Sequence, residues 1–229
     1  MLTSIARSTA QLSDPRIQRV LVRSIGLTIV VLAPLLVGLW FALDQIEVSQ
    51  RWLHWIIDVL GALALFVLAW VLFSVVASLV ISFFLDEVAD AVEARHYPGL
   101  APGRRQSLGE LVREGARFAG VSILLNVLAL PVYAVLLFLP PTNLVVFYGL
   151  NGYLLSREYF ELVAFRRRTP AEARRLRQAH PGQMLILGIL IAFLLTVPLV
   201  NLIAPVFATA LMVHIYHAFV DTPGAVRSP

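Results

Sequence analysis

Residues 59–85 have the sequence VLGALALFVLAWVLFSVVASLVISFFL, which contains no Asp, Glu, Lys, Arg or His. As a helix this segment is roughly 40 Å long, whereas the hydrocarbon core of a bilayer is about 30 Å thick. A charge-free helix of this length is typical of a membrane span. We therefore predict that residues 59–85 cross a lipid bilayer and that the helix extends beyond it on the cytoplasmic side.

The rest of the chain has the same apolar character. Of its 229 residues 59% are hydrophobic and 14% are charged, and the mean hydropathy is +0.82. In soluble domains about a quarter of the residues are charged, so this chain is too apolar to be a soluble domain. Upstream, residues 24–43 form another apolar segment, which is too long for the apolar region of a cleaved signal peptide. We predict a transmembrane helix there, preceded by an interfacial segment over residues 1–23.

Downstream, two apolar regions, 118–165 and 184–220, are each interrupted by a proline turn without charges. The turns contain Pro140 and Asn143 in the first region and Pro198 and Asn201 in the second. Some arms of these regions are only about 20 Å long as helices, which is short for a membrane span. We predict two helical hairpins that penetrate the membrane deeply. The predicted fold class is an all-α integral membrane protein, with two long transmembrane helices plus these two hairpins.

The placement of the arginines predicts the orientation. All 18 basic residues are arginine, and 17 of them lie in the termini and in the two long polar loops. Only Arg51 lies in the loop between the first two helices, which Trp40, Trp52 and Trp55 flank as an interfacial aromatic belt. By the positive-inside rule, both termini and the long loops are cytoplasmic. We expect residues 1–229 to form a single multi-pass domain in a bacterial inner membrane.

Four segments of the chain carry a family resemblance through their order and spacing. They are residues 14–19 (DPRIQR), 82–95 (SFFLDEVADAVEAR), 151–161 (NGYLLSREYFE) and 198–205 (PLVNLIAP). Together they resemble the CysZ sulfate-permease family and its wider kin, the etoposide-induced protein 2.4 family. The resemblance implies two spanning helices, two partly penetrating hairpins, a homo-oligomer and, for CysZ itself, sulfate uptake. Gln18 and Asp86 depart from the family pattern, which has an Arg and a Gly at these positions.

Five polar residues are candidates for binding the transported anion. Arg19, with Arg16 and Arg23, lies near a predicted helix start, where free N–H groups and guanidinium donors favour oxyanions. The alternative is that these arginines serve only membrane topology. Asn143 and Asn201 lie at the predicted hairpin tips, where they either line a polar path or form ordinary turn and interhelical hydrogen bonds.

Two further sets of charges lie close to apolar segments. Arg157 and Glu161 are four residues apart, so they can pair on one helix face, and we predict a structural ion pair. Gating or substrate contact is the alternative. The carboxylates of residues 86–93 are expected to form a solvated helix face, or to pair with the arginines at 95, 104 and 105.

The function classes narrow accordingly. The chain has no cysteine, and it lacks the Walker, nucleophile-elbow, zinc-protease and Rossmann motifs. We predict no enzyme activity, no cofactor, no metal site and no nucleic-acid partner. The preferred function is an inner-membrane transporter or channel for a small inorganic oxyanion, with sulfate first, that supplies sulfur assimilation. The alternative is a non-transporting membrane scaffold that organises partner proteins or anionic lipids through its Arg-rich loops.

Overall fold

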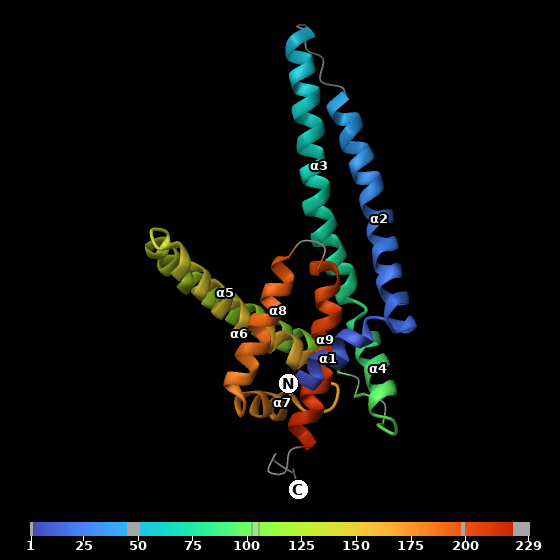
Figure 1. Cartoon of the computed structure of the whole chain (residues 1–229), viewed down its shortest axis with the longest axis vertical. Helices are drawn as coiled ribbons and strands as arrows, with labels where there is room; N and C mark the ends of the chain where they lie inside the picture. The colour runs from blue at the N-terminus through green and yellow to red at the C-terminus, as the bar shows by residue number, and fades with distance from the viewer. Residues whose placement is uncertain (1, 45–50, 102, 105, 198–199, 222–229) are drawn as a thin grey trace.

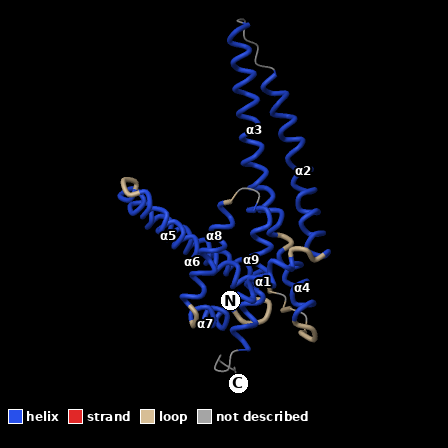
Figure 2. The backbone as a smooth tube through the Cα atoms, viewed as in Figure 1, coloured by secondary structure: helices blue, strands red, loops and turns tan. Residues whose placement is uncertain are grey.

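The computed structural model describes residues 2–44, 51–101, 103–104, 106–197 and 200–221. Within these ranges every regular element is a helix, and Figure 2 shows loops only at the helix ends. In chain order the helices are α1 (Leu2–Gln11), α2 (Pro15–Asp44), α3 (Arg51–Ser82), α4 (Leu85–His96), α5 (Leu108–Leu136), α6 (Pro140–Ala164), α7 (Pro170–Gln178), α8 (Pro181–Thr196) and α9 (Val200–Asp221). The predicted all-α membrane fold is confirmed, because three helices among the described residues are long and apolar enough to cross a bilayer.

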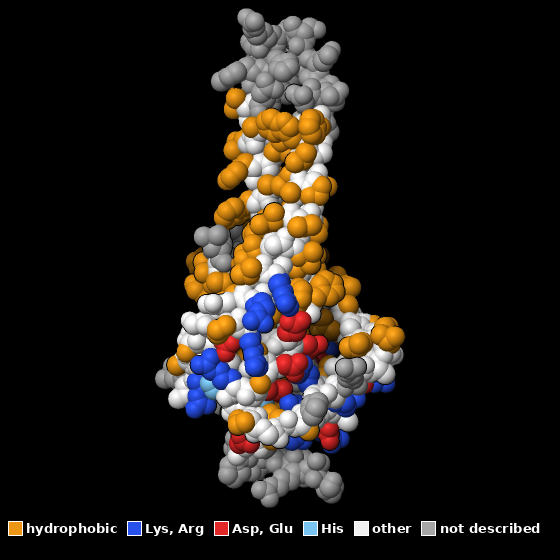
Figure 3. Space-filling view, turned by 90° about the vertical axis from the view of Figure 1, so that its right-hand side faces the viewer, with side chains coloured by type: hydrophobic (Ala, Val, Ile, Leu, Met, Phe, Trp, Pro, Cys, Tyr) orange, Lys and Arg blue, Asp and Glu red, His pale blue; other side chains and the backbone are white. Residues whose placement is uncertain are grey.

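The helices α2 and α3 form an antiparallel pair, called the shaft below, that projects far beyond the other helices (Figure 1). Figure 3 shows apolar side chains along the part of its surface that the structure describes. Phe41 of α2 is 62% exposed and Phe66 of α3 is 67% exposed. Surface of this kind is stable only in a hydrocarbon environment, because its exposure to water is unfavourable over a large area. The shaft is therefore one part of the molecule that lies in the bilayer.

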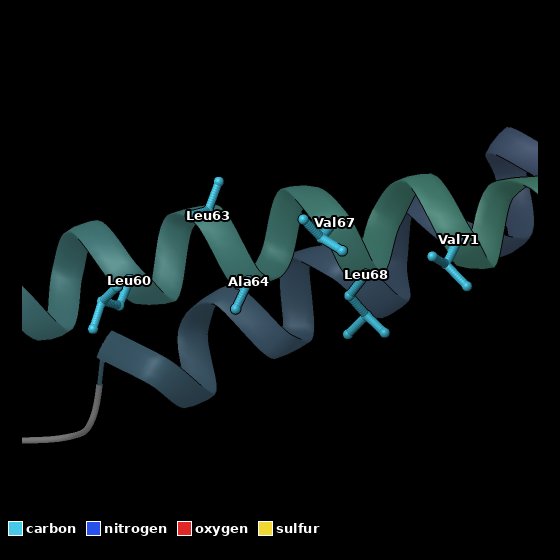
Figure 4. A pocket seen from close by; sticks show the side chains of 6 residues that line it. All are labelled: Leu60, Leu63, Ala64, Val67, Leu68 and Val71. Carbon is cyan, nitrogen blue, oxygen red and sulfur yellow. The ribbon is translucent and has the colours of Figure 1, made fainter. Parts of the chain in front are cut away.

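One side of α3 has a shallow hollow of about 510 Å³ on its lipid-facing surface (Figure 4). It is lined by Leu60, Leu63, Ala64, Val67, Leu68 and Val71. All of these side chains are aliphatic, so the hollow offers no hydrogen bond to a polar ligand. Its chemistry matches acyl chains rather than an ion.

At the base end of the shaft, the observed helix boundaries differ from the predicted ones. The helix α2 begins at Pro15, well before residue 24 where the predicted transmembrane segment begins, because Asp14 accepts a 2.9 Å hydrogen bond from the Arg16 backbone N–H and Pro15 suits the first helical position. The predicted continuation of the second long helix is instead a separate helix, α4, after a turn at residues 83–84. The turn lets the apolar face of α4, with Val88 and Val92, pack in the core.

A second antiparallel pair, α5 and α6, leaves the base of the molecule at an angle to the shaft (Figure 1). Its helices have 29 and 25 residues and are roughly 44 and 38 Å long, so they exceed the predicted hairpin arms. The extra length arises because α5 begins at residue 108, where Ser107 Oγ accepts the Glu110 backbone N–H at 3.2 Å. Only 6% of the most apolar part of α5 is buried inside the protein. Most of this hairpin therefore faces lipid too.

The base, formed by α1, α4, α7, α8, α9 and the adjoining end of α6, contains the protein core. The helix α9 lies at its centre, and α1, α3, α4, α6 and α8 all pack against it. Its most apolar part is 83% buried. The helices α8 and α9 correspond to the second predicted hairpin, whose Pro198 turn lies outside the described residues. The pair α7 and α8 bends by 95°, so α7 lies across the end of the hairpin.

The two hairpins meet where α6 crosses α8. A Cβ atom added to Gly152 would lie 2.7 Å from Ile189 Cγ1, and one added to Gly188 would overlap the Gly152 carbonyl. Both positions therefore require glycine, because any side chain would force the helices apart. Small residues at such crossings allow the close backbone approach that stabilises helix pairs in membranes.

Candidate functional site

The first turns of α2 carry Arg16, Arg19 and Arg23, which lie on one side of the helix because they are three and four residues apart. All three are exposed, and none forms an ion pair within the described part of the chain. The nearest carboxylate in sequence, Asp14, is engaged elsewhere. The Arg16 backbone N–H and Arg95 Nη1, at 2.7 Å, hold the pKa of Asp14 below its ordinary value. The three guanidinium groups are thus free to bind a ligand.

These arginines line a pocket of about 370 Å³ between α2 and α4, called the α2 pocket below. Glu87 and Asp90 of α4 lie on its opposite wall. Figure 3 shows basic and acidic side chains gathered on this side of the molecule, directly below the apolar shaft. A guanidinium group presents parallel N–H donors that match the geometry of an oxyanion. The α2 pocket therefore has the chemistry of an oxyanion site at the boundary between membrane and water.

The carboxylates of α4 are held largely by an arginine from another part of the chain. Arg166 Nη1 lies 3.1 Å from Asp86 Oδ1, and Arg166 Nη2 contacts Asp90. The negative charge at Asp86, where the family pattern has Gly, is therefore compensated. Among the described residues of the α2 pocket, Glu87 is the one carboxylate without an ion pair.

Asp86, Asp90, Glu93, Arg166 and Arg167 together form the Glu93 cluster. Glu93 is 5% exposed, and its Oε2 lies 2.6 Å from Arg167 Nη2 and 3.5 Å from Arg166 Nη2. Burial alone would raise the pKa of Glu93. The neighbouring His217 and Arg167, with the charge of Arg166, outweigh it and lower the pKa to about 2. Glu93 is therefore ionised at neutral pH, and it joins α4 to the loop after α6.

Arg157, Glu161 and Arg177 form a second cluster, called the Glu161 cluster below. Arg157 Nε lies 3.3 Å from Glu161 Oε1, so the structure contains the ion pair that the spacing predicts. Arg177 of α7 adds a second cation, with its Nε 3.4 Å from the same oxygen. All three side chains are less than 10% exposed. Aromatic rings cover the arginines, Phe118 over Arg157 at 5.4 Å and Tyr153 over Arg177 at 5.7 Å.

The structure does not bring the two hairpin tips together. Asn143 lies in the first turn of α6, and Asn201 in the first turn of α9, and their backbone N–H groups donate to Leu139 and Val197. The N-terminal ends of α6 and α9 lie far apart in Figure 1. Neither side chain shares a site with Arg19, which lies on α2. The polar path that these asparagines would line stays a prediction.

Two partners in these clusters are not predicted by the sequence patterns. The α4 carboxylates are expected to form a solvated helix face or to pair with the arginines at 95, 104 and 105, and Asp86 and Asp90 are indeed 73% and 67% exposed. Arg95 pairs instead with Asp14 and Arg104 with Glu110, while position 105 lies outside the described residues. The groups that do pair, Arg166 and Arg167, belong to the run of three arginines at 166–168, directly after an apolar helix. Their position at the end of a membrane-facing apolar helix is the sequence feature that could have indicated this pairing, since charged residues at such positions usually have a partner.

Shaft, hairpins and charged base together define an α-helical integral membrane protein with an arginine-lined pocket at the membrane boundary. The family described as "Sulfate transporter CysZ/Etoposide-induced protein 2.4" matches residues 4–205, which is most of the chain. The chain belongs to this family, as the four sequence segments predicted. It is a transporter-type family and not a class of enzymes. No curated protein matches the chain.

Proposed function

We propose that the protein moves a small inorganic oxyanion, sulfate first, across a bacterial inner membrane and so supplies sulfur assimilation. The observation that carries the proposal is the α2 pocket, in which Arg16, Arg19 and Arg23 have no ion-pair partner among the described residues. Family membership supports the ligand class. We expect the protein to interact with the lipid bilayer, with the anion and with further copies of itself in a homo-oligomer. The homo-oligomer stays a prediction.

The charge balance of the α2 pocket favours an anion. Three guanidinium groups face two carboxylates, and one of these, Asp90, is already in contact with Arg166. A divalent oxyanion can therefore accept hydrogen bonds from several arginines while only Glu87 opposes it without compensation. Because the pocket is open to water, an ion can enter it without crossing apolar surface.

Both ends of the described chain lie in the base, as the predicted topology requires. Figure 1 shows α1 and the end of α9 on the same side of the shaft. Figure 3 shows basic side chains gathered at this end of the molecule on the face in view, which supports a cytoplasmic base under the positive-inside rule. The chain has no cysteine, so single cysteines introduced at residues 104 and 168 can be labelled without background. Labelling of either one from the periplasmic side would contradict the orientation.

Sulfate flux into proteoliposomes tests the function. We expect saturable uptake by the wild-type protein that phosphate and chloride inhibit only weakly. Arg19→Ala removes charge-assisted hydrogen bonds to the anion, so uptake at low sulfate concentration should fall about tenfold. The control is Arg104→Ala, which removes another exposed arginine, one that pairs with Glu110 outside the pocket. Equal uptake by Arg19→Ala and wild type would exclude the proposed role of the α2 pocket.

The substitution Gln18→Arg tests the site in the opposite direction. Gln18 is exposed on α2 beside Arg19, where the family pattern has a second arginine. An added guanidinium there should tighten sulfate binding and lower the concentration for half-maximal uptake. Unchanged uptake would show that position 18 does not contact the ion.

The scaffold alternative requires arginines that are free to bind partners or lipid headgroups. Many arginines of the base form ion pairs with carboxylates of the same chain, including Arg95, Arg104, Arg166, Arg167 and Arg174. This engagement favours transport over a scaffold. Absence of flux for sulfate, phosphate and chloride alike would favour the scaffold.

A further inference from the structure

The Glu161 cluster holds more positive than negative charge in a buried place. Two guanidinium groups, of Arg157 and Arg177, share one carboxylate, and all three side chains are less than 10% exposed. Glu158, next to Arg157 in sequence, is exposed and forms no ion pair with either arginine in the described structure. Arg177 Nε is buried without a hydrogen bond. A buried charge without full compensation costs several kcal/mol, so this cluster favours binding of a further anion.

A comparison within the base shows that this excess is unusual. Glu114 also contacts two arginines, Arg174 at 2.7 Å and Arg113 at 3.5 Å. Arg113 is 71% exposed, however, so water solvates its charge. In the Glu161 cluster both arginines are covered, by protein and by the rings of Phe118 and Tyr153. Solvent cannot neutralise the second cation there to the same extent.

The position of Glu161 is that of an anion between two guanidinium groups. Its Oε1 lies 3.3 Å from Arg157 Nε and 3.4 Å from Arg177 Nε. Both contacts are long compared with the 2.6 to 2.7 Å of the Arg167–Glu93 and Arg174–Glu114 pairs. Arg157 Nε lies equally 3.3 Å from Glu161 Oε2, so the carboxylate is held by three long contacts and by no short one.

We propose that Arg157 and Arg177 form a second anion-binding site, and that the Glu161 carboxylate occupies the position which an incoming oxyanion takes. The anion accepts hydrogen bonds from both guanidinium groups, and the Glu161 side chain swings aside. An inorganic oxyanion such as sulfate suits the site, because it can bridge two forked donors. The choice of sulfate as the ligand rests on the proposed function. The existence of the site rests on the Glu161 cluster alone.

The test is equilibrium binding of radiolabelled sulfate to the purified full-length protein in detergent. Glu161→Gln removes the competing carboxylate, so sulfate should bind at least about tenfold more tightly than to wild type. The matched control is Glu114→Gln, which also removes a carboxylate shared by two arginines but leaves one of them in water, and it should leave sulfate affinity unchanged. Adding Arg177→Gln to Glu161→Gln should abolish the gain. Equal affinities for Glu161→Gln, Glu114→Gln and wild type would overturn the proposal.

A separate measurement tests whether Glu161→Gln folds, because this variant leaves two buried cations without a carboxylate between them. Sulfate should raise its midpoint of thermal unfolding more steeply than that of wild type, and equal slopes would argue against the site. If the variant does not fold, Arg177→Gln alone decides the matter, since Arg157 and Glu161 still pair in it. Arg177→Gln should bind one sulfate fewer than wild type at saturation, and an unchanged stoichiometry would overturn the proposal.

Flux measurements separate this inference from the proposed function. Wild-type protein that carries no sulfate, together with tighter binding by Glu161→Gln, would reject the transport function and leave the site in place. Normal sulfate flux, together with unchanged binding by Glu161→Gln, would reject the site and leave the transport function in place.

Discussion

The Glu93 cluster and the Glu161 cluster both consist of arginines and carboxylates, but their net charges have opposite signs. In the first, three carboxylates surround two arginines, and Arg167 approaches Glu93 to 2.6 Å. In the second, two arginines share one carboxylate at 3.3 and 3.4 Å. The short contacts join α4 to the loop after α6 and hold the base together. The second cluster has one more cation than anion, and its contacts are long. Both features suit a site that binds an anion better than a structural ion pair.

The strongest test of this contrast is the removal of the Glu93 carboxylate. Glu93→Gln leaves Arg166 and Arg167 without their buried partner, so the free energy of unfolding should fall by about 3–5 kcal/mol. Denaturant unfolding of the purified protein in detergent measures the loss. Glu87→Gln serves as the control, because Glu87 is exposed on the same helix and forms no ion pair in the described structure. Similar stability for both variants would show that the Glu93 cluster is not structural.

Acid should weaken the Glu93 cluster in a defined range of pH. The pKa of Glu93 is about 2 in the folded protein, against an ordinary value of 4.5. Its stabilising contribution is therefore complete above pH 4.5 and is lost as the pH falls toward 2. The midpoint of thermal unfolding should drop across this range in wild type and drop less in Glu93→Gln. Parallel pH profiles for the two proteins would be incompatible with this assignment.

Removal of the excess cation should have a much smaller effect. In Arg177→Gln the pair of Arg157 and Glu161 remains. The lost attraction between Arg177 and Glu161 offsets the relief of the buried excess cation, so the free energy of unfolding should change by less than about 1 kcal/mol in either direction. The same unfolding assay provides the measurement. A loss as large as that of Glu93→Gln would mean that Arg177 is a structural partner of Glu161, and the contrast between the clusters would disappear.

The smallest effect is expected at the exposed edge of the base. Arg104 forms a bidentate pair with Glu110, at 2.8 and 2.9 Å, but its side chain is 40% exposed. Water and salt screen such pairs, so Arg104→Gln should cost about 0.5 kcal/mol or less, and this cost should vanish in 1 M salt. A larger, salt-independent loss would show that exposure is a poor guide to the strength of these ion pairs.

The sequence predicts the membrane helices well and their ends poorly. Residues 59–85 are recognisable because a charge-free apolar segment of this length seldom occurs outside a membrane span. The turn at residues 83–84 is hidden in the sequence because the apolar segment continues through Phe83 and Phe84, and only the packing of α4 in the core accounts for the break. The predicted transmembrane segment begins at residue 24 because the first turns of α2 carry arginines, although these turns belong to the same helix.

The same distinction applies to the charged residues. The pair of Arg157 and Glu161 is predictable because both lie on one helix, four residues apart. Arg177 lies on another helix, and only the packing of α7 beside α6 brings it to the same carboxylate. Arg166 reaches Asp86 across 80 residues of chain, a separation about which a single sequence holds no information. Pairs within one element could therefore be predicted, and pairs between elements could not.

The crossing of α6 and α8 at Gly152 and Gly188 limits how the protein can move. Because the two backbones already touch there, the hairpins cannot rotate closer, and a change of their angle must first break this contact. The contact of α6 with α8 therefore couples the two hairpins, and a motion of one hairpin carries the other with it for as long as the two backbones touch.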